Sequence, residues 1–174
     1  MKSITVFCGS SPGTNPRFLE QATQLGEALA QRDISLVYGG ADIGLMGAIA
    51  NGTLAANGKV IGVLPAFLQT REIAHQGLTE LIVVKSMHER KTKMNDLCDG
   101  IIALPGGFGT IEELFEILTW VQLGLQNKPI GVLNVDGYFD SLITFIQSMV
   151  DNGFLRATDA DLLIVRDNVS ELLQ

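Results

Sequence analysis

The chain has 174 residues, of which 47% are hydrophobic and 18% are charged. This length suits a single core, and we predict one domain over residues 1–174. The composition excludes a disordered protein, because disorder requires low hydrophobicity and high charge. A formal net charge of −7 excludes a chain that is held to nucleic acid by its overall charge.

Two cysteines, Cys8 and Cys98, are too few for a disulfide-stapled scaffold, and neither belongs to a CxxC pair that could bind a metal. The amino-terminal segment lacks the longer apolar run of a secretion signal. No stretch of about 18 apolar residues predicts a membrane span. We therefore expect a soluble, cytoplasmic protein with no membrane partner and no bound metal.

Seven short apolar runs along the chain are typical of strands that are buried on both faces. The predicted strands are 4–8, 35–38, 60–64, 81–84, 101–104, 130–133 and 162–165. Longer helical patterns lie between most of these runs. The predicted helices are 18–32, 44–57, 86–99, 110–126 and 138–151. This alternation predicts an α/β fold, with a parallel sheet of about seven strands and helices on both faces.

Loops rich in small residues follow four of the predicted strands. Their sequences are GSSPGTN (9–15), GGADIGLMG (39–47), PAFLQTREI (65–73) and PGGFGT (105–110). In parallel α/β sheets, ligands bind outside the carboxyl ends of the strands, so these loops should gather around one pocket. The residues expected to line it from the first two strand ends are Cys8, Gly9, Ser10, Gly39 and Gly40.

Two common nucleotide-binding motifs do not fit the sequence. The nearest match to a Walker A loop, GTLAANGKV at 52–60, is one residue too long, ends in Val60 instead of a hydroxyl residue, and precedes a strand. The dinucleotide-binding pattern fails after the first strand, which is followed by GSSPG, and GFGTIE from Gly107 lacks the third glycine. We therefore expect neither P-loop nor nicotinamide chemistry.

The most informative motif is IIALPGGFGTIEE at 101–113. Three of the four residues after Pro105 are glycines, which permit backbone conformations closed to other residues. Thr110 is expected to open a helix, so that successive N–H groups point at one spot beside the positive helix end. Such an arrangement favours a phosphate. A tight turn without a ligand is the alternative.

Glu113 has two interpretations that the sequence leaves open. With Thr110 it matches a capping box, in which the two residues satisfy backbone donors at the start of a helix. Alternatively, its carboxylate faces the pocket and acts in catalysis. The two roles could coexist if one oxygen caps the helix and the other faces the pocket. The sequence does not decide whether Glu112 shares that work.

The helix predicted at 86–99 carries two cations on its apolar side. At about 100° per residue, its buried stripe consists of Met87, Met94, Leu97 and Cys98. Arg90 and Lys91 fall inside or beside that stripe, where a charge is costly unless it meets an anion. We interpret the two as part of an anionic substrate site beside the glycine loop. Snorkelling, or a salt bridge to Glu112 or Glu113, is the alternative.

Four motifs together resemble one family. CGSSPGTN, YGGADIGLMG, MHERK and PGGFGTIEE are similar to the lonely guy family of cytokinin riboside 5′-monophosphate phosphoribohydrolases, long mislabelled as possible lysine decarboxylases. The resemblance covers almost the whole chain, including TWVQLGLQNKPIGVLNVDGYFDSL at 119–142, and the PGGxGTxxE motif is specific. One departure is Ala41, where the family usually has a third glycine. This change narrows the loop slightly and touches no reacting group.

The resemblance implies a Rossmann-like, doubly wound fold, usually in a homodimer. It implies hydrolysis of the N-glycosidic bond of an adenosine 5′-monophosphate, often N6-prenylated, to the free base and ribose 5-phosphate. The small-molecule nucleotide is the only ligand implied, without a metal, nicotinamide or pyridoxal cofactor. The family's catalytic arginine and glutamate fall on Arg90 and Glu113. Its substrate-contacting residues fall on Glu72, Lys91, Gly106, Gly107, Phe108, Gly109, Thr110 and Thr119.

Several alternatives stay open beside this interpretation. The apolar residues from Ile111 onward spread over every side of their helix, which favours a dimer, although a helix buried within one subunit would look the same. The chain could also act on plain AMP, since Met87 and Met94 are adaptable wall residues that do not define a specific base pocket. The remaining alternatives are a non-catalytic carrier of a phosphorylated ligand and the decarboxylase of the old family label.

Overall fold

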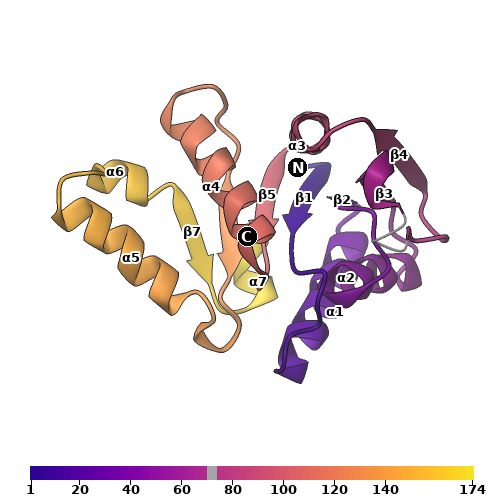
Figure 1. The fold of residues 1–174 in the computed structure, drawn as a ribbon. Helices are drawn as coiled ribbons and strands as arrows, with labels where there is room; N and C mark the ends of the chain where they lie inside the picture. Colours follow the sequence, from indigo (N-terminus) through magenta and orange to yellow (C-terminus); the bar gives the residue numbers. More distant parts are fainter. Residues whose placement is uncertain (70–73) are drawn as a thin grey trace.

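The computed structural model describes residues 1–69 and 74–174. Within these residues, seven parallel strands form one sheet in the order β4-β3-β2-β1-β5-β6-β7 (Figure 1). The strands are β1 (Ser3–Phe7), β2 (Ser35–Tyr38), β3 (Val60–Pro65), β4 (Glu80–Val84), β5 (Gly100–Ala103), β6 (Ile130–Leu133) and β7 (Leu163–Arg166). Each lies within one residue of its predicted position, and the doubly wound α/β fold is confirmed.

Five longer helices correspond to the predicted ones. They are α1 (Pro16–Gln31), α2 (Gly44–Ala55), α3 (Met87–Asp96), α4 (Phe108–Gln122) and α5 (Asp140–Asp151). Local chemistry sets two of the starts: the Asn15 side chain accepts a hydrogen bond from the Arg17 N–H, and the Ser86 hydroxyl accepts one from the Glu89 N–H. In the described parts of the chain, the structure adds four short helices that the sequence did not predict: η1 (Ala66–Leu68), η2 (Val135–Gly137), α6 (Ala157–Ala160) and α7 (Val169–Leu172).

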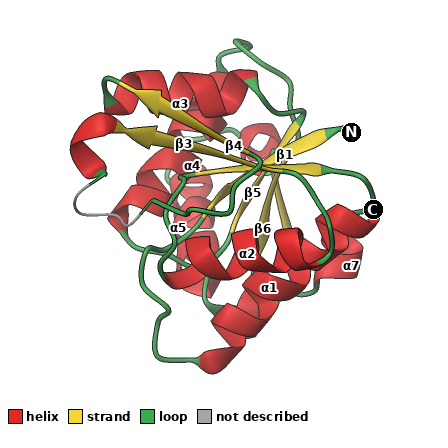
Figure 2. Ribbon diagram, turned by 90° about the vertical axis from the view of Figure 1, so that its right-hand side faces the viewer, coloured by secondary structure: helices red, strands yellow, loops and turns green. Residues whose placement is uncertain are grey.

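Helices cover the sheet on both faces (Figure 2). One hydrophobic cluster joins the sheet to α1, α2 and α7, and a second joins it to α3, α4 and α5. Strand β2 contributes to both, with Leu36 and Tyr38 in the first cluster and Val37 in the second. This division follows from the alternation of side chains along a strand, which buries a continuous apolar run on two sides.

The sheet order brings the predicted loops together. The chain runs from the central β1 outward to β4, and α3 then crosses back to β5 on the other side of β1. The carboxyl ends of β1 and β5 are neighbours, with Phe7 paired to Ala103. Beyond them the Gly9 N–H donates to the Pro105 carbonyl over 3.0 Å, and the Gly9 carbonyl accepts from the Leu45 N–H over 3.1 Å. The loops after β1, β2 and β5 therefore meet at the point where the winding of the sheet reverses.

Within the two described segments, no helix has the length and apolar character needed to cross a lipid bilayer.

Candidate active site

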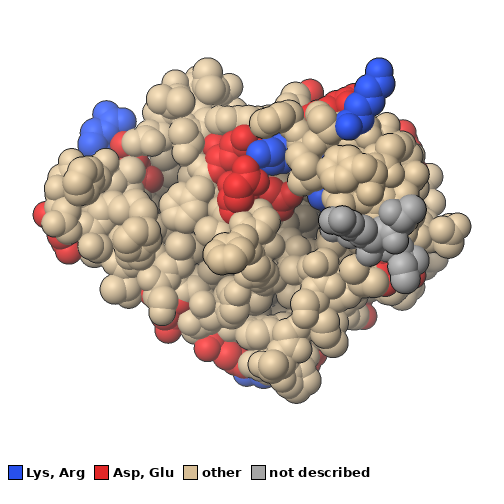
Figure 3. Space-filling view, viewed as in Figure 1, with Lys and Arg blue, Asp and Glu red and all other residues tan. Residues whose placement is uncertain are grey.

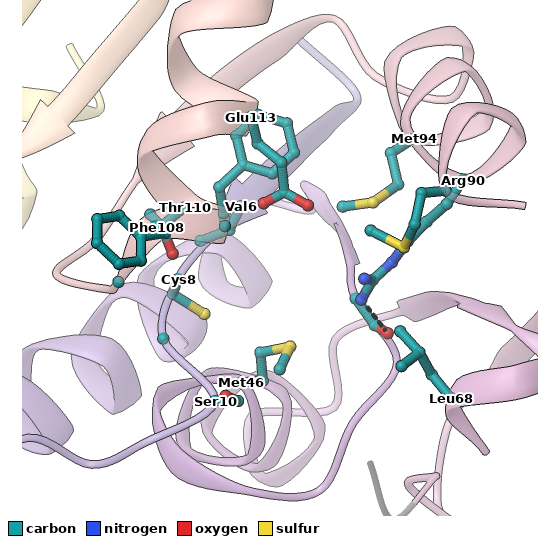
Figure 4. Close-up of a pocket in the computed structure, with 16 residues that line it drawn as sticks. Val6, Cys8, Ser10, Met46, Leu68, Arg90, Met94, Phe108, Thr110 and Glu113 are labelled. Atoms are coloured by element: carbon teal, nitrogen blue, oxygen red, sulfur yellow. Dashed lines mark hydrogen bonds between the residues drawn. The ribbon is translucent and has the colours of Figure 1, made fainter. Parts of the chain in front are cut away.

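A cavity of about 320 Å³ opens at this reversal point (Figure 4). Its volume lies in the range of small-molecule sites, about 300–1,000 Å³. The lining residues are Val6, Phe7, Cys8, Gly9, Ser10, Gly39, Met46, Leu68, Met87, Arg90, Met94, Gly107, Phe108, Gly109, Thr110 and Glu113. They come from the ends of β1 and β2, from η1, and from α2, α3 and α4.

The start of α4 forms one wall of the cavity. The helix begins at Phe108 with Gly107 as its N-cap residue, and no side chain in the described segments caps it. Thr110 is already inside the first turn and is buried, so of the two interpretations left open for Glu113 the capping box with Thr110 is wrong. The N–H groups of a first helical turn have no partner within their own helix, and here they border the cavity.

Glycines keep the space beside this helix start open. A Cβ atom added to Gly107 or Gly109 would have no heavy atom within 4 Å. Gly106 differs, because a Cβ atom there would collide with the Thr110 side chain. Gly106 therefore allows the Thr110 side chain to pack closely against the loop, whereas Gly107 and Gly109 leave the helix end accessible to a ligand.

Arg90 reaches the cavity from the opposite helix, α3. Only 6% of the residue is exposed. Its Nε donates to the Val63 carbonyl over 3.0 Å, and its Nη2 donates to the Gly39 carbonyl over 2.8 Å. These acceptors lie at or beside the carboxyl ends of β3 and β2, so the guanidinium is fixed to the sheet edge. The predicted buried face of this helix is confirmed, since Arg90, Lys91 and Met94 are its buried residues.

Glu113 follows one turn after the start of α4, and its carboxylate points into the cavity (Figure 4). The Cys8 thiol faces the same space from the end of β1. Burial raises the pKa of Cys8 well above the usual thiol range, and the negative charge of Glu113 raises it further, whereas the Arg90 charge lowers it. Both charged groups therefore act on the pKa of the thiol, which stays protonated at neutral pH.

Lys91, the neighbour of Arg90, points elsewhere. Its Nζ lies 2.7 Å from Oε1 of Glu112 and 3.0 Å from Oε2 of Glu116, two carboxylates on one side of α4. Figure 3 shows acidic side chains gathered with basic ones in this part of the surface. Lys91 does not line the cavity, and an ion pair with Glu112 is the alternative that the sequence had left open.

Most of the residues predicted at the site line this single cavity. From the strand ends these are Cys8, Gly9, Ser10 and Gly39, from α3 Met87 and Arg90, and from α4 and its N-cap Gly107, Phe108, Gly109, Thr110 and Glu113. Glu72 lies outside the described residues.

Three further predicted residues are not among those that line the cavity. Gly40 has a φ of +83°, and its carbonyl accepts the His75 N–H instead of facing the cavity. Gly106 borders a neighbouring cavity, where its carbonyl accepts a hydrogen bond from the Tyr138 hydroxyl over 2.6 Å. Thr119 lies about three turns after the start of α4, and its hydroxyl donates to the Phe115 carbonyl.

Sequence analysis missed four lining residues, Val6, Phe7, Met46 and Leu68. Two of them lie in segments that the small-residue loops had marked, since Met46 belongs to GGADIGLMG and Leu68 to PAFLQTREI. Apolar residues at strand ends and helix starts carry no sequence signal that separates the core from a cavity wall. In the described segments, no three His, Cys, Asp or Glu residues are grouped so that they could hold a metal ion.

Comparison with known proteins places this geometry in a family. The profile described as "Possible lysine decarboxylase" matches residues 46–174. Two relatives from Arabidopsis thaliana are named cytokinin riboside 5′-monophosphate phosphoribohydrolases, LOG2 and LOG7. LOG2 is 46% identical over 99% of this chain and 81% of its own length, and LOG7 is 47% identical over 99% and 80%.

Solved structures agree on the fold. A molybdenum cofactor carrier protein from Chlamydomonas reinhardtii has a TM-score of 0.74 at 23% identity, covering 98% of this chain and 92% of its own. A molybdenum cofactor binding protein from Rippkaea orientalis has a TM-score of 0.74 at 25% identity, covering 99% and 94%. The full-length similarity to the plant enzymes is much higher, and the chain belongs to the lonely guy family, whose profile still carries the description of a possible lysine decarboxylase.

Proposed function

We propose that the chain is a phosphoribohydrolase that cleaves the N-glycosidic bond of an adenosine 5′-monophosphate carrying an N6 substituent. The products are the free base, a cytokinin, and ribose 5-phosphate. The observation that carries the proposal is the meeting of Arg90, Glu113 and the uncapped start of α4 in one cavity. The plant relatives, at 46% and 47% identity, have this activity in their names.

The 5′-phosphate belongs at the start of α4. The N–H groups of the first turn and the positive end of the helix dipole favour an anion, and the space beside Gly107 and Gly109 admits one. Thr110 adds a side-chain hydroxyl in the same wall. Binding of the phosphate fixes the ribose in place, so that binding energy remote from the reacting carbon is used to orient it.

Glu113 acts on the anomeric carbon. As the bond between C1′ and the base nitrogen breaks, positive charge builds on the ribose ring, and a carboxylate beside the ring stabilises it. The oxygen of a water molecule then bonds to C1′, one of its protons ends on the departing base, and Glu113 can take that proton in transit. Arg90, held by two backbone carbonyls, orients Glu113 or the substrate.

The base faces a wall of soft apolar side chains. Met46, Met87, Met94 and Leu68 line the cavity, and unbranched methionines adapt to ligands of different shape. This wall can accommodate an N6-alkyl group, and the cytokinin activity named for the plant relatives favours an N6-alkylated base over plain AMP as the preferred substrate. Kinetics with AMP and with N6-isopentenyl-AMP separate the two, and a higher kcat/KM for AMP would identify a general nucleosidase.

A homodimer is also part of the proposal. Large apolar side chains are exposed at the end of α4 and around α5, where Leu125 is 70%, Phe145 58% and Phe154 88% exposed. Burial of such residues against a second copy would stabilise a dimer. Light scattering at micromolar concentration tests it, and a monomer would contradict it. The single domain over 1–174, the cytoplasmic location and the lack of nucleic-acid binding stay predictions.

The decisive experiment is a substrate panel. The purified chain is incubated with 5′-monophosphates, ribosides and free bases, with and without EDTA, and release of ribose 5-phosphate is followed. We expect release only from monophosphates, and most rapidly from N6-alkylated AMP. Tight nucleotide binding without release of base would instead identify a carrier on the same fold. No change in any nucleotide would refute the hydrolase.

A further inference from the structure

The hydroxyl of Tyr138 reaches the glycine loop in front of α4 from the connection that follows β6. It donates a hydrogen bond to the Gly106 carbonyl over 2.6 Å, although the two residues are 32 positions apart in the chain. Tyr138 comes directly after η2, and Gly106 comes directly before the N-cap of α4. The contact therefore joins the segment after β6 to the loop that leads into the proposed phosphate site.

Two aromatic contacts restrict the ring of Tyr138. Phe18 of α1 lies edge-on to it with 5.5 Å between ring centroids, and Phe139 does so at 5.0 Å. Phe139 is itself buried, and its N–H donates to the Asn134 side chain over 2.7 Å. Although 42% of Tyr138 is exposed, its ring is thus packed on two others, and its hydroxyl is held at the Gly106 carbonyl.

The peptide group that Tyr138 contacts lies between two glycines, Gly106 and Gly107. The preceding peptide is held separately, because the Pro105 carbonyl accepts the Gly9 N–H over 3.0 Å. If the peptide between the glycines turned over, the negative φ of Gly107 would become positive, which glycine adopts about as readily. A Cβ atom at Gly107 would have no atom within 4 Å, so packing does not oppose this change. The hydrogen bond from Tyr138 therefore favours one of two accessible orientations.

The orientation matters because a trans peptide directs its carbonyl and its N–H to opposite sides. The Gly106 carbonyl is turned toward Tyr138, and both residues line the neighbouring cavity of about 300 Å³. Gly107 lines that cavity and also the active-site cavity, so it belongs to the wall between them. Among the described residues, none accepts a hydrogen bond from the Gly107 N–H. This donor is therefore available to a ligand on the side away from Tyr138.

We propose that Tyr138 is a positioning residue for the phosphate: by holding the Gly106 carbonyl, it directs the Gly107 N–H into the active-site cavity at the start of α4. This inference rests on the proposed function, which places the 5′-phosphate there. With the peptide turned over, the Gly106 carbonyl oxygen would face the anion, and an attractive contact would be replaced by a repulsive one. Tyr138 itself does not touch the ligand in this role.

The binding test compares Tyr138→Phe with the wild type in the full chain. The substitution removes the hydroxyl and keeps the ring that packs on Phe18 and Phe139. We expect the Kd of ribose 5-phosphate and the KM of the monophosphate substrate to rise about threefold to tenfold, the usual effect of one hydrogen bond. The value of kcat should change less than about twofold, because the lost interaction binds substrate and transition state alike. The affinity for the riboside, which has no phosphate, should not change.

Tyr38→Phe is the matched control. Tyr38 is the other tyrosine of the chain, and its hydroxyl likewise donates to a loop carbonyl, that of Ala41, over 3.2 Å. The Kd of ribose 5-phosphate in this variant should equal that of the wild type. An unchanged Kd in Tyr138→Phe would overturn the role of Tyr138. An equal loss of affinity for the riboside and for ribose 5-phosphate would also overturn it, since the cavity as a whole would then have changed.

A measurement on the wild type separates the role of Tyr138 from the proposed function. Ribose 5-phosphate is titrated into the isotope-labelled chain, and the amide signals of Gly107 and Gly109 are followed by NMR. We expect both signals to shift, and the shift of Gly107 to be smaller in Tyr138→Phe. A response of Gly109 alone would show that the phosphate binds without the Gly107 N–H, which would overturn the inference.

Two further outcomes distinguish the two levels of the argument. If neither amide responds, the phosphate does not bind at the start of α4, and the role of Tyr138 fails together with that part of the proposed function. If both amides respond as expected but no nucleotide releases its base, the hydrolase is refuted and the role of Tyr138 in anion binding is supported.

Discussion

The Nη2 atom of Arg90 donates a hydrogen bond to the carbonyl oxygen of Gly39 over 2.8 Å, and the missing side chain of Gly39 makes this approach possible. A Cβ atom at position 39 would collide with Nη2 of Arg90 and lie 2.8 Å from the sulfur of Met46. The glycine that follows β2 is therefore required for the position of the buried guanidinium, although it carries no chemistry of its own.

Gly39→Ala is expected to displace Arg90 and lower kcat by roughly tenfold to a hundredfold, the range in which small misplacements act. Because the guanidinium bonds to the Val63 and Gly39 carbonyls would be strained, the free energy of unfolding should also fall by about 1–3 kcal/mol. Steady-state kinetics and urea unfolding measure the two effects. Wild-type kcat in a stably folded Gly39→Ala variant would show that the position of Arg90 is not important for turnover.

Glu113→Gln is expected to lower kcat by about 10²–10⁴-fold, the usual contribution of a positioned acid or base. The substitution keeps the size of the side chain and removes only its charge, so binding of the phosphate at the start of α4 should persist. Calorimetric titration with ribose 5-phosphate provides the control. A fully active Glu113→Gln enzyme would refute the assignment, and a parallel loss of binding would place Glu113 in the ligand site instead of the reaction.

Gly109→Ala is expected to separate stability from activity. Gly109 is inside α4, where alanine is favoured over glycine by roughly 0.5–1 kcal/mol, and no atom lies within 4 Å of the new Cβ, so Tm should rise. The added methyl group occupies the space proposed for the phosphate. KM should rise about tenfold or more, because a hydrogen bond to a charged group contributes about 1.5–3 kcal/mol. An unchanged KM would show that the phosphate does not bind at this helix end.

Cys8 provides a pH-dependent prediction. Burial, and then the charge of Glu113, raise the pKa of Cys8 in the folded protein above the ordinary thiol value of 9.0. At a pH above 9.0 but below the folded pKa, the thiol therefore loses its proton in the unfolded chain and keeps it in the folded protein. The contribution of Cys8 to the free energy of unfolding is therefore fully present below pH 9.0. As the pH rises above 9.0, the free energy of unfolding falls by about 1.4 kcal/mol per pH unit. Urea unfolding of the wild type and of Cys8→Ala at pH 8 and pH 10 measures this loss. The difference in the free energy of unfolding between the two proteins should be smaller at pH 10 than at pH 8. A constant difference would contradict the raised pKa.

The same shift can be followed by alkylation. Because the reactive species is the thiolate, Cys8 should react slowly with iodoacetamide in the native protein at neutral pH. Glu113→Gln removes the negative charge that raises the thiol pKa, so alkylation should become faster in that variant. Equal rates in the two proteins would show that Glu113 does not act on the thiol.

The sequence predicted the fold well because the strands are buried on both faces and read as unbroken apolar runs. It predicted the buried cations equally well, since the stripe containing Met94 is a local property of α3. The start of α4 was misjudged because Gly107, and not Thr110, adopts the N-cap conformation, and glycine gives no hydrogen-bonding signal for that role. Helices of four residues, such as α6 and α7, are too short to show a period.

The ion-pair partners of a side chain, and whether a loop residue faces the cavity, could not be predicted from the sequence in the same way. A pattern of burial indicates that Lys91 needs an anion, but its choice of Glu112 and Glu116 depends on how α3 and α4 lie against each other. Likewise, Gly40 and Gly39 are adjacent and chemically identical, yet a φ of +83° turns Gly40 toward the neighbouring β3–β4 side. Such differences are set by tertiary packing, which a local pattern does not contain.

The crossing of α3 from β4 to β5 joins two portions of the molecule that carry different reactive groups. A fragment that ends before β5 would contain Arg90 without Glu113, and a fragment that begins at β5 would contain Glu113 and the proposed phosphate site without Arg90. Neither fragment would be a weaker version of the enzyme. The proposed catalytic pair requires both portions of the chain. A cut at the α3–β5 connection would therefore test whether the two portions reassemble, which a cut in a loop within one portion would not.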